Sequence, residues 1–280
     1  RLAYIVFTSG SSGQPRAVMH AHRAILARQA MMQGWYGLRP DDRLLHAGAF
    51  NWTFTLGTGL LDPWTLGATA LIPAPGTPID QTPALAARHG ATILAGAPGI
   101  FRRLLRADWP PIATLRHALA AGERLDPALR AAWTARTGTD IHEAMGASEI
   151  STFLSGSPDR PAPPGTAGYP QPGRHVAVLD TDGPGQPGPL AVRADDPGLF
   201  LGYLDDPAAT QACFRDGWFL TGDLAQAAPD GAVTLLGRAD DIMNAGGFRV
   251  APPEIEDHLS THPDAGDVAV AELPIAPGVS

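Results

Sequence analysis

Residues 2–16 read LAYIVFTSGSSGQPR, an apolar run followed at once by a loop of small residues. The run at residues 2–7 predicts a strand that is buried on both faces. The loop at residues 8–13 contains only threonine, serine and glycine, and Arg16 is the first charge after it. Such a loop can hold phosphate, because glycine lets backbone N–H groups approach oxygen anions and hydroxyls add donors. A flexible surface loop is the alternative, and these residues alone leave both interpretations open.

Composition narrows the class of protein. The 280 residues carry a net charge of −8, with 44% hydrophobic and 17% charged residues, as in globular proteins. The negative balance argues against nucleic acid and anionic membranes as partners, so any phosphate chemistry has to be local. All 20 basic residues are arginine, so no lysine chemistry is available. No apolar run is long enough to span a membrane, and the single cysteine, Cys213, favours a cytoplasmic protein.

The first half of the chain alternates strand-like and helix-like segments. This alternation predicts an α/β fold with a parallel sheet. A helix is expected from about residue 22 to residue 33. Another helix is expected to open at Asp126, an N-cap residue followed by Pro127, and to run through Arg136.

A stretch rich in proline and glycine, residues 155–173, marks a change of organisation. Short strand patterns between residues 175 and 236 then predict a small antiparallel β subdomain. A helix at 254–260 and a strand at 267–273 follow. The predicted fold is a multi-layer α/β core with a small β subdomain and the start of a small α+β C-terminal domain, at residues 1–165, 166–239 and 240–280.

Three more motifs follow the first loop in a particular order. They are AGERLDPALRAAWTARTGTDIHEAMGASE at 121–149, GWFLTGD at 217–223 and GRADDIMNAGGFRVAPPEIE at 237–256. Together with YIVFTSGSSGQPRAV at 4–18, they resemble the adenylate-forming superfamily of acyl-CoA synthetases, peptide-synthetase adenylation domains and luciferases. The resemblance implies that an acid is activated with ATP to an acyl-adenylate and is then transferred to a thiol.

The resemblance also implies a nucleotide site. Thr8 and the loop after it would grip the β- and γ-phosphates, with Arg16 in place of the usual lysine. Ser148 would contact the α-phosphate, and Glu149 would hold Mg²⁺. Met145 replaces the usual aromatic residue at adenine, and core filling is the alternative for it. The other implied contacts are Ser9, Gly10, Ser11, Ser12 and Gly13 at the phosphates, Gly122, Glu123 and Gly146 around adenine, Asp223 at the ribose, and Arg238 at the ribose or phosphate.

Two further regions take roles from the same resemblance. Asp240 matches the hinge about which the family's small C-terminal domain swings. Gly246, Gly247 and Phe248 match a tunnel for a phosphopantetheine thiol, although an ordinary turn explains them equally well. His142 and Glu143 have no partner at metal-ligand spacing, so we interpret them as strand residues.

Residues 44–61, LLHAGAFNWTFTLGTGLL, contain no charged side chain. The resemblance places the acyl pocket here, which assigns Phe50, Trp52 and Gly57 to it, together with Gly96. The missing carboxylate disfavours an amino-acid substrate, whose ammonium group would need one. A buried helix with core aromatics fits the same pattern.

The preferred interpretation is an acyl- or aryl-CoA ligase that uses ATP, Mg²⁺, coenzyme A and a small carboxylic acid. The sequence indicates no oligomeric state. The alternatives are an amino-acid-activating adenylation domain and a truncated, non-catalytic nucleotide-binding protein. The family's main cation for adenylation is a lysine near its C-terminus, a motif that this chain does not reach. We therefore expect a piece of a larger fold, cut at both ends, that does not adenylate acids on its own.

Overall fold

The computed structural model is a mixed α/β fold with several sheets. No helix in the described part of the chain is long and apolar enough to cross a membrane. The described residues are 1–8, 15–241, 243–245, 248–250, 252–260, 262 and 268–271.

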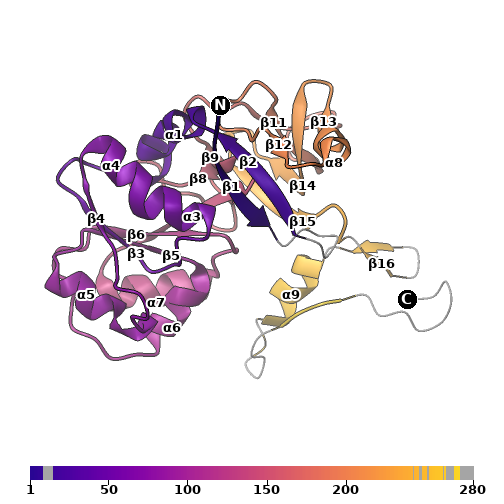
Figure 1. Cartoon of the computed structure of the whole chain (residues 1–280). Helices are drawn as coiled ribbons and strands as arrows, with labels where there is room; N and C mark the ends of the chain where they lie inside the picture. Colours follow the sequence, from indigo (N-terminus) through magenta and orange to yellow (C-terminus); the bar gives the residue numbers. More distant parts are fainter. Residues whose placement is uncertain are drawn as a thin grey trace.

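A seven-stranded sheet is the largest element of the fold (Figure 1). Its first five strands in spatial order run parallel, and each of the last two pairs antiparallel with the strand before it. The prediction of an α/β fold on parallel strands is therefore confirmed. In spatial order the strands are β4 (Thr69–Leu71), β3 (Arg43–His46), β5 (Ile93–Gly96), β6 (His117–Ala121), β7 (Ile141–Ala147), β8 (Ser151–Ser155) and β9 (Tyr169–Pro170).

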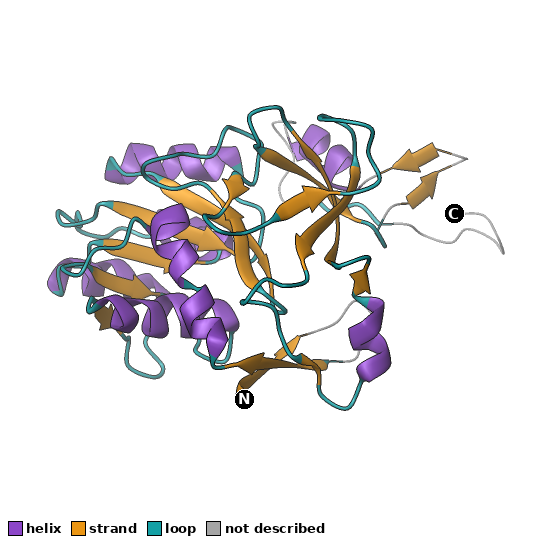
Figure 2. Ribbon diagram, turned by 90° about the horizontal axis from the view of Figure 1, so that it is seen from above, coloured by secondary structure: helices purple, strands orange, loops and turns teal. Residues whose placement is uncertain are grey.

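Helices cover both faces of this sheet (Figures 1 and 2). Alternate residues of β5 therefore enter different cores: Leu94 packs with one set of helices, and Ile93 and Ala95 pack with the other. The first set is η3 (Ile79–Gln81), α5 (Thr82–Arg88), α6 (Pro98–Leu105) and α7 (Pro127–Thr137). The second set is α1 (Arg23–Ala27), α2 (Gln29–Met31), the π-helical turn η1 (Met32–Tyr36), α3 (Thr53–Leu56), the π-helical turn η2 (Gly57–Leu61) and α4 (Asp62–Leu66).

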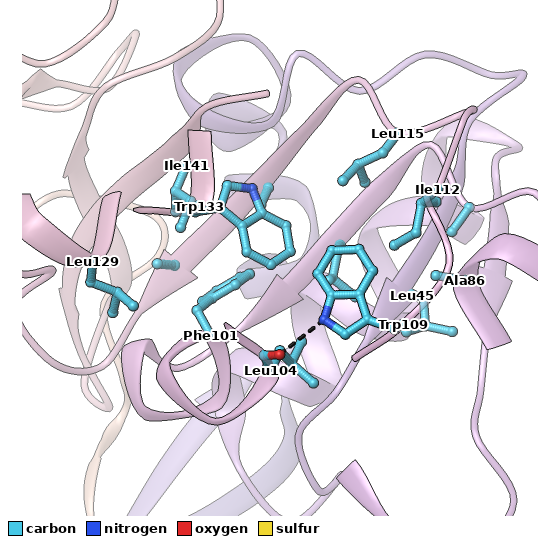
Figure 3. Close-up of a cluster of buried hydrophobic side chains, with 14 of the residues drawn as sticks. Leu45, Ala86, Phe101, Leu104, Trp109, Ile112, Leu115, Leu129, Trp133 and Ile141 are labelled. Carbon is cyan, nitrogen blue, oxygen red and sulfur yellow. Dashed lines mark hydrogen bonds between the residues drawn. The ribbon is translucent and has the colours of Figure 1, made fainter. Parts of the chain in front are cut away.

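Two tryptophans anchor the core beneath α6 and α7 (Figure 3). Trp133 is fully buried and meets the ring of Phe101 edge-to-face, with the centroids 4.9 Å apart. The indole N–H of Trp109 donates to the Leu104 carbonyl at 2.9 Å, so its polar end is satisfied inside the core. The predicted N-cap of α7 is confirmed, because the Asp126 carboxylate accepts from the backbone N–H two residues on.

The stretch expected as a helix at residues 22–33 is helical, but it is not one regular α-helix. The structure divides this stretch into α1, α2 and η1, and the chain then turns at Gly37 with a φ of +53°. Arg28, at the first junction, is only 3% exposed and pairs with Asp62 in the interior. The sequence pattern treats an arginine in a helix as a solvent-facing charge, and that assumption fails here.

The expectation that residues 2–7 form a strand buried on both faces is wrong. This stretch forms β1 (Leu2–Thr8), an edge strand that pairs antiparallel with β2 (Arg16–Ala21), which in turn pairs with β12 (Gly202–Tyr203). Val6 is buried, but Phe7 on the opposite face is 73% exposed. An edge strand of a three-stranded sheet has only one face against the core, and apolar content alone does not reveal this.

The small β subdomain forms around a five-stranded sheet, where the sequence predicts it. Its elements are β10 (Val176–Val178), β11 (Gly188–Arg193), α8 (Pro207–Ala212), β13 (Phe214–Arg215), β14 (Trp218–Ala227) and β15 (Val233–Arg238). After it come β16 (Met243–Ala245), β17 (Phe248–Val250) and α9 (Pro252–Ser260). Residues 268–271, the described part of the strand expected at 267–273, form no strand. The domain boundaries near residues 165 and 239 stay a prediction.

Candidate active site

A cleft of about 440 Å³ lies where β6 and β7 reach their carboxyl ends. Ligands of open parallel sheets bind at this edge, because the loops that leave the strands diverge there. One wall comes from the turn before α3, and the opposite wall comes from β14 and β15. The lining residues are Trp52, Thr53, Phe54, Thr58, Ala121, Gly122, Glu123, Arg124, Glu143, Ala144, Met145, Gly146, Ala147, Ser148, Ser151, Thr152, Asp223, Leu235 and Arg238.

The cleft brings together many of the residues singled out in the sequence. Four stretches that lie far apart in the chain contribute to it. The predicted residues that line it are Trp52, Gly122, Glu123, Met145, Gly146, Ser148, Asp223 and Arg238. Thr8, Arg16, Phe50, Gly57, Gly96 and Glu149 are not among its lining residues. Ser9, Gly10, Ser11, Ser12, Gly13, Gly246 and Gly247 lie outside the described residues, as does the side chain of Phe248.

Asp223 and Arg238 face each other across β14 and β15. They are direct partners in the strand register, and a guanidinium nitrogen lies 3.5 Å from a carboxylate oxygen. Burial raises the pKa of Asp223 above its ordinary value, although Arg238 opposes the shift. The charge of this carboxylate is therefore only partly compensated by the protein, so it can accept hydrogen bonds from a ligand.

Gly122 has a role that the resemblance does not imply. A Cβ at this position would lie 2.5 Å from the Trp52 indole, and the φ of Gly122 is +97°. Only glycine combines that backbone conformation with so close an approach. The structure thus places a residue predicted for the acyl pocket directly against one predicted for the adenine site.

Gly146 is equally constrained, but by the backbone. A Cβ here would overlap the carbonyl of Ser151, at an irregularity between β7 and β8. Ser151 itself has a φ of +71°, a left-handed conformation that is uncommon for serine. The tight return from β7 into β8 therefore determines how both strands present their side chains to the cleft.

Tyr203 connects two of the residues predicted to be catalytic. Its hydroxyl donates to a Glu149 carboxylate oxygen at 2.7 Å, and the guanidinium carbon of Arg16 lies 5.1 Å from its ring centroid. Burial, and next the hydrogen bond to Glu149, raise the pKa of Tyr203, which remains a donor at neutral pH. Arg16 in turn pairs with Thr8 in the strand register. Arg16 and Glu149 thus meet at a tyrosine that the sequence motifs did not identify, and Thr8 lies beside Arg16 in the neighbouring strand.

A buried ion pair lies behind the cleft and also escaped sequence analysis. Arg28 donates to both carboxylate oxygens of Asp62, at 2.8 and 2.7 Å. Tyr36 donates to the same carboxylate at 2.7 Å and is 2.7 Å from the hydroxyl of Thr58, which lines the cleft. Arg28 also donates to the hydroxyl of Ser151, a second lining residue. Asp62 lies one residue beyond the uncharged stretch at 44–61, which is the only sequence signal for this network.

The region predicted for the acyl pocket divides between cleft and core. Trp52 and Phe54 line the cleft, and Phe54 also belongs to the core that contains Ile93 and Ala95 of β5. Gly57 lies against the guanidinium of Arg28, where a Cβ would clash, and Gly96 faces Ile100. Part of this segment therefore lines the cleft and part is buried in the core, and its contact with an acyl group stays a prediction.

Glu143 lines the cleft from β7, which confirms it and His142 as strand residues. Its carboxylate accepts from the Leu125 backbone N–H at 2.8 Å, while burial raises its pKa. Among the described residues no three His, Cys, Asp or Glu side chains lie close enough together to hold a metal. A metal at Glu149 would therefore need ligands from elsewhere, such as phosphate oxygens.

A second cavity, of about 750 Å³, adjoins the first. It shares Arg124, Asp223 and Arg238 with the cleft, and it extends past Asp240 to α9. Asp240, the predicted hinge, also accepts from the Arg238 guanidinium at 3.3 Å. The predicted hinge residue thus lies beside residues that line the candidate active site.

The comparison with known proteins gives the class of protein to which this fold and cleft belong. The model of the AMP-binding enzyme family matches residues 1–204, so the chain belongs to that family. It is 35% identical to a 3-hydroxybenzoate–CoA/4-hydroxybenzoate–CoA ligase of Thauera aromatica, over 100% of this chain and 54% of the relative. The chain therefore spans about half the length of the curated relatives it matches.

Solved structures support the same assignment. ATP-bound MatB from Rhodopseudomonas palustris superimposes with a TM-score of 0.89 at 30% identity, over 99% of this chain and 56% of that one. The anthranilate CoA ligase AuaEII, in complex with anthranoyl-AMP, gives a TM-score of 0.85 at 29% identity, over 96% and 54%. The mixed α/β architecture is therefore that of AMP-binding enzymes.

Proposed function

We propose that this chain carries the nucleotide and acid sites of an AMP-forming acid–CoA ligase. The observation that supports this best is that residues from four separated stretches meet in one cleft at the carboxyl edge of the parallel sheet. In the reaction, a carboxylate oxygen bonds to the α-phosphorus of ATP and pyrophosphate leaves. The thiolate of coenzyme A then bonds to the acyl carbon, and AMP leaves.

The wall made by Asp223 and Arg238 would hold the sugar. Asp223 would accept from the ribose hydroxyls, because its carboxylate is only partly compensated by Arg238 at 3.5 Å. Gly122, Glu123 and Met145 would form the adenine side of the same cleft. Ser148, after β7, would donate to the α-phosphate.

The cluster around Tyr203 would serve the phosphate end. Arg16 would neutralise developing charge on the leaving pyrophosphate, and Thr8 begins the loop that would hold it. Glu149 is the residue that would hold Mg²⁺. The ion usually keeps one or two protein carboxylates and takes its other ligands from phosphates and water, which suits a site with a single carboxylate. The metal would supply charge neutralisation.

The second cavity would accept the thiol. It lies beyond Asp240, the residue about which the C-terminal segment would turn, and the stretch from Gly246 to Phe248 continues from it along the chain. The names of the similar proteins refer to hydroxybenzoates, anthranilate and malonate, so they do not specify one acid. A carboxylic acid is the common substrate class, with ATP and coenzyme A as cosubstrates.

The test is acid-dependent exchange of pyrophosphate into ATP, followed by CoA-dependent release of AMP, with the protein encoded by the whole reading frame. Exchange that depends on added carboxylic acid supports the proposal; nucleotide binding without exchange would identify a binding protein instead. We further expect the 280-residue chain alone to bind AMP but to adenylate poorly, since it contains no lysine. Robust exchange by this chain alone would contradict that expectation.

A further inference from the structure

The cleft contains a hydroxyl that accepts a hydrogen bond but donates none within the described residues. Ser151 accepts a hydrogen bond from Arg28. A serine hydroxyl also has one proton to donate. No acceptor for that proton occurs among the described residues, and Ser151 lines the cleft. A hydroxyl that accepts from a guanidinium is polarised into a better donor, so the unused proton is suited to a ligand oxygen.

The position of the Arg28 guanidinium does not depend on the cleft. It is held by Asp62 through two hydrogen bonds and by Tyr36 and Thr58 at 3.2 and 3.4 Å. Burial opposes its charge, but Asp62 more than offsets this and raises the pKa of Arg28, which stays ionised. Ser151 therefore accepts from a guanidinium whose position is fixed, and its own proton can be donated to a ligand in the cleft.

A second hydroxyl on the same cleft is unsatisfied. Thr53, the first residue of α3, lines the cleft and is 6% exposed, and its hydroxyl has no hydrogen-bond partner. A buried polar group without a partner has lost its hydration and gained nothing in return, which destabilises the protein. A ligand with a polar group at this wall would reduce that destabilisation.

The residues on either side of Thr53 in the sequence make part of the cleft wall aromatic. Trp52 and Phe54 line the cleft and meet edge-to-face, with centroids 5.3 Å apart. Such pairs offer a flat surface to another ring, whose own edge and face complement theirs. Aromatic walls with isolated polar groups are typical of sites that fix the orientation of a ring by one substituent.

Ser151 also adopts an unfavourable backbone conformation. Its φ of +71° is one that glycine would adopt without strain. Strained residues gather at functional sites, where the surrounding structure holds them. Despite this conformation the position carries a serine, whose hydroxyl contacts Arg28 and which lines the cleft.

We propose that Ser151 is a specificity-determining residue for an aromatic acid that carries a hydroxyl substituent. Its proton, polarised by Arg28, is donated to the substituent oxygen, away from the reacting carboxylate. The ring lies against Trp52 and Phe54, and Thr53 adds a second polar position on the same wall. This inference rests on the proposed function and adds the class of acid to it.

The experiment compares benzoate with 3- and 4-hydroxybenzoate in the ligase encoded by the whole reading frame. We expect kcat/KM to be at least tenfold higher for one hydroxybenzoate than for benzoate. Ser151→Ala and Ser151→Gly should lower kcat/KM for that hydroxybenzoate by about tenfold, mainly through KM, and leave benzoate within about twofold. The glycine variant suits the local φ, so it keeps the test valid if the alanine variant does not fold.

Ser155→Ala is the matched control. Ser155 lies in the same strand, is buried and donates to the Gly34 carbonyl at 2.7 Å, but does not line the cleft. It should leave the ratio of hydroxybenzoate to benzoate unchanged. An equal loss for all acids in the Ser151 variants, or a wild-type enzyme that prefers benzoate or aliphatic acids, would overturn the inference and leave the ligase function standing. No acid-dependent AMP release from any acid would overturn the proposed function and this inference with it.

Discussion

Two arginine–aspartate pairs belong to the candidate site, one lining the cleft and the other buried behind it, and they differ in nearly every physical respect. The Arg28–Asp62 pair is almost inaccessible, with side chains 3% and 1% exposed and two hydrogen bonds joining them. The Arg238–Asp223 pair is 42% and 15% exposed, and its closest approach is 3.5 Å. The first pair satisfies its charges inside the protein, and the second leaves a carboxylate partly uncompensated for a ligand.

The difference shows why residue type does not define a role. In a buried pair each charge depends on its partner, because a buried charge that loses its partner is not hydrated by water instead. A pair at the edge of a cleft can exchange its partner for a ligand at little cost in stability. The four predictions below test this contrast, from the largest expected effect to the smallest.

Removing one member of the buried pair should have the largest effect. Asp62→Ala leaves the Arg28 guanidinium charged and without its main partner, and should lower the free energy of unfolding by about 3–5 kcal/mol. Urea denaturation followed by circular dichroism measures the loss. Asp223→Ala is the matched control and should change the unfolding free energy by about 0.5 kcal/mol or less. Similar losses for both variants would show that the two pairs do not differ in this way.

Acid should have the next largest effect, through two histidines that are buried in the fold. Burial lowers the pKa of His46 to about 3 and that of His117 to about 4, against 6.5 when unfolded. Both are held neutral in the folded protein, so their contribution is complete above pH 6.5 and is lost as the pH falls toward 4. Each should cost about 2 kcal/mol of unfolding free energy between pH 7.5 and pH 5.

Urea titrations at several pH values measure this slope. His46→Asn should reduce the loss between these pH values by about 2 kcal/mol, although the variant itself should be less stable at pH 7.5. A slope that is unchanged in this variant would mean that His46 titrates normally in the folded protein.

Changing the open pair should alter binding rather than folding. Asp223→Asn removes the charged acceptor proposed for the ribose and should weaken AMP binding by about tenfold or more, because hydrogen bonds to charged groups contribute about 1.5–3 kcal/mol. Isothermal titration calorimetry on the 280-residue chain measures the affinity. If Asp223→Asn kept the full affinity for AMP, Asp223 would not belong to the AMP site, whatever the result for Asp62→Ala.

The smallest effect is a pH dependence of that binding. Because burial raises the pKa of Asp223, its charged form is lost at a higher pH than for an ordinary carboxyl. AMP affinity should therefore fall by no more than about a few fold as the pH decreases from 7 to 5, and less in Asp223→Asn. An affinity that rises over this range in the wild type would contradict the sign of the shift.

Local patterns were sufficient for most of the fold. The parallel sheet, the N-cap at Asp126 and the small β subdomain follow from periodicity and turn residues. The failures were at segments whose surroundings decide their burial. The residue 2–7 strand looks doubly buried by composition, yet Phe7 is exposed. The helical pattern at 22–33 does not reveal that Arg28 is buried, because neither pattern records what packs against the segment.

The sequence by itself determined the family, the order of the motifs and several of the residues that meet in the cleft. Only the tertiary structure decided that Arg28 finds Asp62 in the interior, that Trp52 lies on Gly122 and that Tyr203 joins Arg16 to Glu149. The physical reason is distance along the chain. Motif residues are recognised by their near neighbours, whereas the partners of these side chains are brought to them only when the sheets pack.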